Sequence, residues 1–175
     1  MGSCETVDGF VGYAVRARPG LWREAYRLCG DWHEADDLVQ ETLWRVYRRW
    51  NALTRRAELA SYTHKALVHV FLGERRRHRW RYEVNQPQPD PGGSAPMPDV
   101  PLRETLRGAL RKLAPRQRAA VVLRYCEDLS TEQVADILGC STGTVASQTH
   151  RALRILRADL DELSGSAPDI THRTN

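Results

Sequence analysis

Apolar residues recur at helical spacing along much of the chain, and the clearest pattern lies in residues 130–160. Ser130 can cap a helix, and Gln133 three positions later completes a capping-box pattern. Gly139 stands where that helix must end, because glycine adopts a left-handed backbone at little cost. One stripe of residues then predicts a long second helix: Val145, Thr149, Ala152, Leu156 and Leu160. Two helices around a tight corner predict a helix-turn-helix.

The outward face of the second helix in this motif is polar or basic. Its members are Ser141, Thr142, Thr144, Ser147, Gln148, Arg151 and Arg154. Such side chains can bond base edges and phosphates, and a recognition helix presents its first turns to the major groove. The alternative is an ordinary helical hairpin with a solvated polar face. The agreement of cap, turn and polar face favours DNA recognition.

A second strong helix is predicted for residues 31–50, with acids in its first turns and arginines in its last. This distribution complements the helix dipole. The inward stripe is Val39, Leu43, Val46 and Trp50. Candidate docking residues lie on the remaining surface: Asp36, Asp37, Gln40, Glu41 and Trp44. From the residues alone, a solvated helix face is the simpler interpretation, and protein docking is the alternative.

A polar stretch at residues 51–60 predicts a loop before a third helix, whose basic end follows. Residues 65–81 hold six Lys or Arg and one acid, Glu74. Such a cluster is often a solvated helix end, and DNA contact beside Trp80 is the alternative. The candidate contacts are Asn51, Arg55, Arg56, Tyr62, Lys65, His69, Arg75 and Arg76. Trp50 and Tyr62 can stack on bases, although a place in the core is the more common role.

The remaining pattern divides the chain into two helical domains. Residues 83–101 contain six prolines and two glycines, which predicts a flexible linker. Leucines at helical spacing and then Pro115 predict two more helices within residues 102–128. Pro19-Gly20 is predicted to interrupt the first helix. The expected architecture is all-α, with domains at residues 8–82 and 102–160 and a disordered tail at 161–175.

Composition excludes several classes of protein. The formal net charge of +4 favours an anionic partner without identifying one. No apolar run approaches the roughly 20 residues of a membrane span, and no signal-peptide pattern begins the chain, so we expect a cytoplasmic protein. Four widely spaced cysteines without a CxxC pair predict no metal site and no disulfide framework. No nucleotide-binding, metalloprotease or serine-hydrolase motif occurs in the sequence, so we expect neither an enzyme nor a cofactor.

Two motifs in this order resemble a known family. The sequence Asp36-Asp37-Leu38-Val39-Gln40-Glu41-Thr42 resembles the core-binding motif of bacterial sigma factors, and the helix-turn-helix resembles their promoter −35-binding domain. The order, spacing and short length resemble the extracytoplasmic-function (ECF) group, which keeps only domains 2 and 4. Resemblance to the actinobacterial SigE-like subgroup rests on further phrases, including Leu113-Ala114-Pro115-Arg116-Gln117-Arg118.

This resemblance implies a sigma factor that binds core RNA polymerase and promoter DNA, with an anti-sigma factor as a candidate partner. Asp37, Gln40 and Glu41 would contact the clamp of the β′ subunit, and the second domain would dock on the β flap. The loop and basic helix would bind the −10 element. Ala146 stands where many relatives carry a basic residue, which removes one possible −35 contact. The alternative is a helix-turn-helix regulator that binds DNA without loading polymerase.

Overall fold

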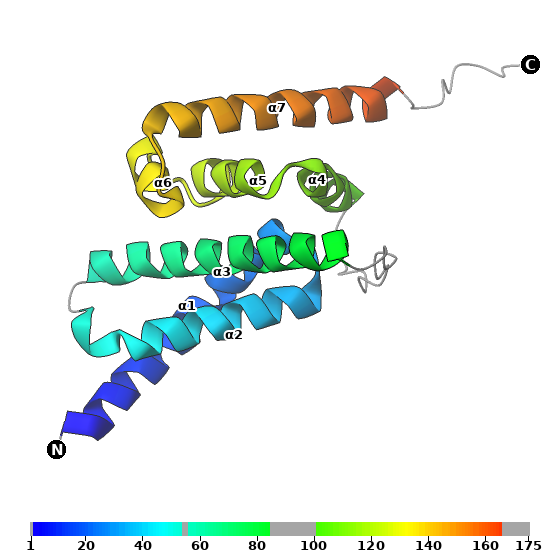
Figure 1. Ribbon diagram of the computed structural model, residues 1–175. Helices are drawn as coiled ribbons and strands as arrows, with labels where there is room; N and C mark the ends of the chain where they lie inside the picture. The colour runs from blue at the N-terminus through cyan, green and yellow to red at the C-terminus, as the bar shows by residue number, and fades with distance from the viewer. Residues whose placement is uncertain (1, 54–55, 85–100, 166–175) are drawn as a thin grey trace, which may run out of the picture.

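The computed structural model describes residues 2–53, 56–84 and 101–165, which form helices and short connections without strands (Figure 1). The N-terminal domain comprises α1 (Gly2–Cys29), α2 (Trp32–Arg48), the 3₁₀ turn η1 (Trp50–Ala52) and α3 (Arg56–Val84). The C-terminal domain comprises α4 (Pro101–Lys112), α5 (Pro115–Val121), the π-helical η2 (Val122–Cys126), α6 (Thr131–Leu138) and α7 (Thr142–Gly165). The predicted all-α fold with two helical domains is confirmed.

The helix-turn-helix forms as its sequence predicts. Ser130 Oγ accepts a hydrogen bond from the Gln133 backbone N–H at 3.2 Å, and Gln133 Oε1 accepts one from the Ser130 N–H at 2.7 Å. Gly139 ends α6 with φ +61°, in the left-handed region. Ser141 Oγ then accepts from the Thr144 N–H at 3.2 Å and caps α7. Both helix starts and the corner between them are therefore fixed by local hydrogen bonds.

Helix α1 is continuous, so the predicted interruption at Pro19-Gly20 is wrong. Proline inside a helix removes one backbone hydrogen bond and typically costs about 3 kcal/mol. Pro19 lies on the exposed side, and Val15, whose carbonyl would have accepted that bond, is 70% exposed, so water can replace the lost partner. Leu21 and Leu28 are buried beyond the proline, and their packing holds the second half of the helix in place.

Two predicted boundaries shift because helices continue. Helix α3 runs to Val84 and α4 begins at Pro101, so both edges of the predicted linker at 83–101 are helical. Residues 85–100 of this linker lie outside the described chain. Helix α7 runs to Gly165, so the prediction of a disordered tail from residue 161 is wrong for residues 161–165. Leu160, Glu162 and Leu163 are good helix formers, whereas Gly165 at the end of the helix is a poor one. Residues 166–175 lie outside the described chain.

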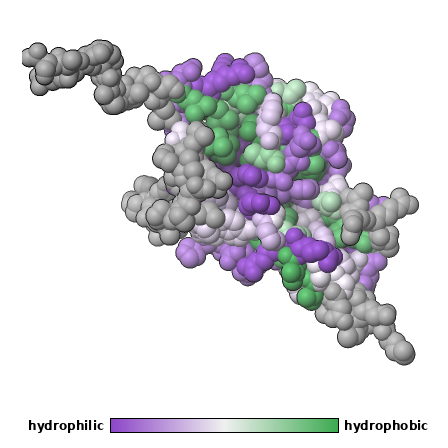
Figure 2. Space-filling view, turned by 180° about the vertical axis from the view of Figure 1, so that it is seen from behind, coloured by the Kyte–Doolittle hydropathy of each residue, from purple (hydrophilic) through white to green (hydrophobic). Residues whose placement is uncertain are grey.

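Apolar stripes are buried except near their ends. In α7, Val145, Ala152 and Leu156 are buried, but Leu160 is 40% exposed. In α4, Leu106 is 47% exposed although Leu110 is buried. Hydrophobic side chains accordingly reach the reverse surface in patches between hydrophilic ones (Figure 2). Periodicity identified the inward face of each helix, but the length of the neighbouring elements decides how much of that face is covered.

The two domains pack against each other as stacked layers (Figure 1). Helix α7 forms the outer layer, α4, α5 and α6 lie beneath it, and α3 separates them from α2. One buried cluster runs through both domains and includes Leu28, Phe71, Leu123 and Ile137. The sequence left the arrangement of the domains open, and the structure shows them sharing a core.

Arg118 is a buried link between the domains. Its guanidinium donates to the carbonyls of Leu28, at 2.6 Å, and of Arg111 and Leu113, at 2.9 and 3.2 Å. The side chain thus satisfies the C-terminal ends of α1 and α4. Burial, followed by the nearby charge of Arg75, lowers the pKa of Arg118 to about 10, so Arg118 stays charged at neutral pH.

Candidate nucleic-acid interface

The outward face of α2 is open to solvent. Asp37, Gln40 and Trp44 are exposed, and Trp44 is 56% exposed. Glu41 is half-exposed and accepts a hydrogen bond from Arg45 Nε at 2.8 Å. Four of the five candidate docking residues thus lie at helical spacing on one accessible face. The opposite face is buried in the domain core through Leu38, Val39, Thr42 and Val46.

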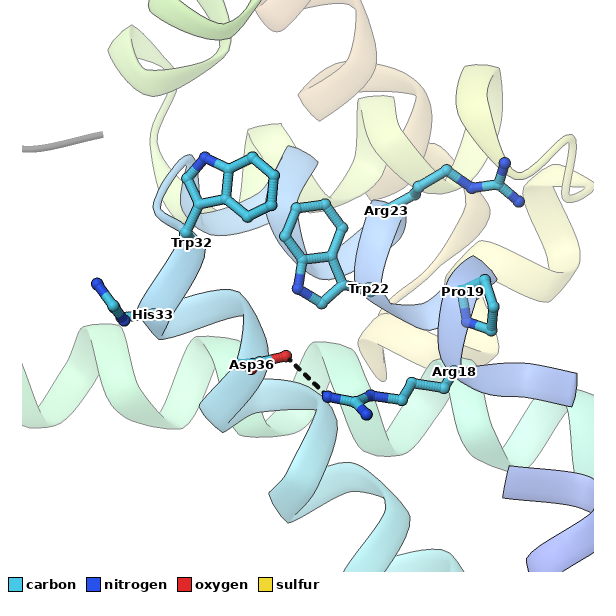
Figure 3. A pocket seen from close by; sticks show the side chains of 7 residues that line it. All are labelled: Arg18, Pro19, Trp22, Arg23, Trp32, His33 and Asp36. Atoms are coloured by element: carbon cyan, nitrogen blue, oxygen red, sulfur yellow. Dashed lines mark hydrogen bonds and ion pairs between the residues drawn. The ribbon is translucent and has the colours of Figure 1, made fainter. Parts of the chain in front are cut away.

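Asp36 points toward α1 instead. It lines a surface pocket between α1 and α2 together with Arg18, Pro19, Trp22, Arg23, Trp32 and His33 (Figure 3). Its carboxylate accepts from Arg18 Nη2 at 3.3 Å, and the two side chains are 45% and 59% exposed. The Trp22 and Trp32 rings lie beside this pair, with centroids 4.6 Å apart. An exposed pair of this kind is worth at most about 1 kcal/mol, so Asp36 can exchange it for another partner.

The candidate −10 residues around η1 and the start of α3 have different environments. Asn51 is exposed, whereas Tyr62 is half-buried beneath the Arg49 guanidinium, 5.6 Å from the ring centroid. Arg55 lies outside the described residues, and Arg56 begins α3 with a side chain that the structure does not describe. The half-buried place of Tyr62 agrees with a packing role.

Aromatic packing also accounts for Trp50. Its ring meets Phe10 at 5.5 Å and Tyr13 at 5.5 Å between centroids. Trp50 lies in η1 and is half-buried, so it extends the N-terminal core rather than continuing the inward stripe of α2. Its interpretation as a packing residue agrees with these contacts.

Two candidate −10 residues in the middle of α3 contact the C-terminal domain but still reach solvent. Lys65 Nζ lies 3.1 Å from a carboxylate oxygen of Asp136 in α6, and the Lys65 side chain is 37% exposed. His69 Nε2 lies 3.0 Å from the Ile137 carbonyl oxygen of the same helix, and His69 is exposed. The first helix of the helix-turn-helix therefore contacts two polar groups of α3 that were expected to face DNA.

Further along α3, the remaining two candidates differ from each other. Arg75 Nη2 lies 2.7 Å from both carboxylate oxygens of Glu34, and its guanidinium also lies over the Phe71 ring. Arg76 is exposed. Arg75 thus joins α3 to the start of α2. Its guanidinium, which was predicted to contact a DNA phosphate, is paired with Glu34 instead.

The outward face of α7 is accessible along its first turns. Ser141, Thr142, Thr144, Ser147, Arg151 and Arg154 are exposed, and Gln148 is half-buried. Ser141 Oγ is the helix cap, and Ser147 Oγ donates to the Thr144 carbonyl at 2.9 Å, so these hydroxyls already have partners. Gln148, Arg151 and Arg154 are left as the longest polar side chains on this face. All seven predicted residues belong to α7 or its cap.

Two family matches cover the regions that carry these surfaces. Sigma-70 region 2 matches residues 14–81, and Sigma-70 region 4 matches residues 103–156. The RNA polymerase sigma-E factor of Streptomyces coelicolor is 36% identical over 160 residues, which cover 86% of this chain and 85% of that protein. The chain belongs to the sigma-70 family, in its ECF group. The ECF RNA polymerase sigma factor SigL of Mycobacterium tuberculosis is 34% identical, with 82% of this chain and 84% of that protein covered.

A solved structure has the same fold as this ECF sigma factor. The sigma factor RpoE of Bartonella quintana, in a co-crystal with the anti-sigma factor NepR, superposes with a TM-score of 0.70 at 25% identity. The match covers 87% of this chain and 97% of the RpoE chain. Both domains of this sigma factor therefore have counterparts in one solved protein.

Other candidate chemistry in this sigma factor is sparse. The described cysteines Cys29, Cys126 and Cys140 are free thiols. Burial raises the pKa of Cys29 to about 12, which makes it a poor nucleophile at neutral pH. Among the described residues, no helix is both long and apolar enough to cross a membrane.

Proposed function

We propose that this ECF sigma factor docks on core RNA polymerase through the exposed face of α2 and directs it to promoter DNA. The accessible row Asp37, Gln40, Glu41 and Trp44 carries this proposal. Acidic side chains on a rigid helix can pair with basic groups of a partner and so fix how the two proteins align. One exposed aromatic side chain adds contact area. Action with polymerase on chromosomal DNA places the protein in the cytoplasm.

For DNA, we assign recognition of the −35 element to α7. We assign recognition of the −10 element to η1 and the second half of α3. Gln148, Arg151 and Arg154 have the reach and chemistry to contact base edges and phosphates in the major groove. Asn51 and Arg76, both exposed, are the accessible −10 candidates. Two DNA contacts tethered in one chain raise each other's effective concentration, which a single helix-turn-helix cannot do.

In the packed arrangement, α6 groups lie 3.1 and 3.0 Å from the side chains of Lys65 and His69 and would compete with −10 DNA for them. We propose that engagement with polymerase and promoter DNA replaces these contacts between the two domains. RpoE in its similar solved structure is held by an anti-sigma factor. We propose an anti-sigma factor as a further partner of this chain, one that competes with polymerase for it.

The decisive experiment is run-off transcription with purified RNA polymerase core, with and without the protein, on fragments of the native genome. We expect discrete start sites that appear only with the protein. Neither transcripts nor co-elution with core would overturn the proposal and favour a regulator that binds DNA without polymerase.

The docking face is tested with Glu41→Lys. This reversal places a positive charge in the proposed charge pairs, so we expect core affinity to fall at least about tenfold in fluorescence titrations. Asp161→Lys makes the same charge change on an exposed residue of α7 and serves as the control. Thermal melts check that both variants fold. Equal core affinities for the two variants would show that α2 is not the docking helix.

A further inference from the structure

A cluster of three potential metal ligands lies where the two domains meet. Glu24 comes from α1, His64 from α3, and Glu127 directly follows η2 in the C-terminal domain. One ligand atom from each of these side chains lies within 4.8 Å of the other two. These residues are far apart in sequence and belong to no motif, so only the fold brings them together.

Glu24 is the residue whose surroundings are incomplete. It is 1% exposed, and its Oε2 lies 2.8 Å from His64 Nδ1. Its second oxygen, Oε1, is buried without a hydrogen-bond partner. A buried carboxylate oxygen without a partner is costly, and a cation is one of the few groups that satisfies it. This orphaned oxygen is an observation independent of the clustering, and it points to a ligand.

Glu127 completes the cluster from the other domain. Its Oε1 accepts from Arg27 Nη1 at 2.8 Å, and its side chain is 19% exposed. The Glu127 carboxylate lies close to the Glu24 carboxylate, since the ligand atoms of the cluster are within 4.8 Å of one another. Arg27 engages Oε1 of Glu127, so the second carboxylate oxygen remains for an ion.

We propose that Glu24, His64 and Glu127 bind one divalent transition-metal ion, with Zn²⁺ as the best match, and that this ion bridges the two domains. Two carboxylates and one imidazole suit Zn²⁺, which commonly takes three protein ligands and a water. Ca²⁺ and Mg²⁺ prefer all-oxygen sites with more ligands, so they are disfavoured. A neutral His64 is required, because only the deprotonated ring nitrogen can coordinate.

The bridge has a structural consequence. Two ligands belong to the N-terminal domain and one to the C-terminal domain, so the complete site exists only while the domains are packed together. An ion that binds only the packed form stabilises it by mass action. In the same packed form, Lys65 and His69 contact α6. The ion would therefore favour the arrangement in which α6 groups compete with DNA for these two residues.

The test uses the full chain after dialysis against a chelator. Isothermal titration with ZnCl₂ should give one site per chain, and Co²⁺ should give the visible absorption bands of a low-symmetry, partly nitrogen-ligated ion. Zinc in large excess over its dissociation constant should raise the melting temperature by about 5 °C.

Variants locate the site. Glu127→Gln and His64→Ala should each weaken zinc binding at least about tenfold and remove most of the thermal shift, as expected for loss of one ligand. His33→Ala and Glu132→Gln remove the same groups at exposed positions outside the cluster and should bind zinc like the wild type. Glu127 is partly exposed and follows a short helix, whereas His64 lies inside α3, so the Glu127 variant decides the question if His64→Ala does not fold.

No zinc binding, or binding that all four variants retain, would overturn the proposal. A thermal shift that survives in Glu127→Gln would overturn the bridge, since that ligand is the one from the C-terminal domain. The experiment needs neither polymerase nor promoter, so its failure leaves the proposed transcriptional role untouched.

Discussion

The two DNA-binding surfaces proposed here differ in access. The outward face of α7 belongs to the outer layer of the molecule, and most of its predicted contacts are exposed (Figure 1). The middle of α3 lies against α6, which contacts Lys65 and His69 while leaving His69 exposed and Lys65 partly exposed. Polar residues predicted with similar arguments thus differ in whether they have partners in the other domain. The packing of the domains determines which polar residues are free to bind DNA, and the sequence of a single helix does not.

Helix α6 explains the difference because it has neighbours in both domains. It supports α7 within the helix-turn-helix, and it also packs on α3 of the other domain. Its Asp136 places a carboxylate 3.1 Å from the Lys65 ammonium group, so this acid would compete with a DNA phosphate for the proposed contact. The packed arrangement should therefore leave the proposed −35 surface open and weaken the proposed −10 surface, and the following changes test that contrast.

The largest effect is expected from Arg118→Ala, which removes the buried link beneath both domains. The carbonyls of Leu28, Arg111 and Leu113 lose this partner, so we expect the free energy of unfolding to fall by about 3 kcal/mol in urea titrations. Arg116→Ala, which removes one bond to the Leu138 carbonyl within the C-terminal domain, should cost about 1 kcal/mol. Equal losses in the two variants would show that Arg118 has no special role between the domains.

A smaller effect is expected on the open surface. Arg151→Ala removes an exposed cation from the recognition face, and we expect affinity for a duplex that carries the −35 element to fall about tenfold. Fluorescence anisotropy at several salt concentrations measures this loss and the number of phosphate contacts. Arg157→Ala, on the same helix but turned away from Gln148, is the control. If Arg157→Ala weakens binding as much, the assigned face of α7 is wrong.

The smallest effect is expected where α6 contacts α3. Asp136→Lys replaces the partner of Lys65 with a like charge, so domain separation becomes easier. Because this ion pair is largely exposed, the gain is limited, and we expect binding of a single-stranded −10 oligonucleotide to rise about threefold.

Its control is Glu132→Lys, which makes the same charge change on an exposed residue of α6. An equal rise in both variants would mean that net charge alone increased affinity. No rise in Asp136→Lys would mean that α6 does not restrict the α3 surface.

Local sequence determined the elements that depend on nearby residues. Ser130, Gln133 and Gly139 form the predicted cap and corner, because their hydrogen bonds and backbone angles involve neighbours within a few positions. The exposed row on α2 follows from helical spacing in the same way. Pro19 is the instructive error: its local preference predicted a break, but burial of Leu21 and Leu28 maintains the helix.

Only the tertiary structure decided which polar groups are available and which are joined. Lys65 and Asp136 are 71 positions apart, and nothing in their local sequences predicts that they pair. Likewise, Arg118 reaches the carbonyl of Leu28, 90 positions away, and Glu24, His64 and Glu127 converge from separate segments. Such contacts arise because helices bury their apolar faces together, and polar side chains at the edges of those faces then take whichever partners the packing supplies.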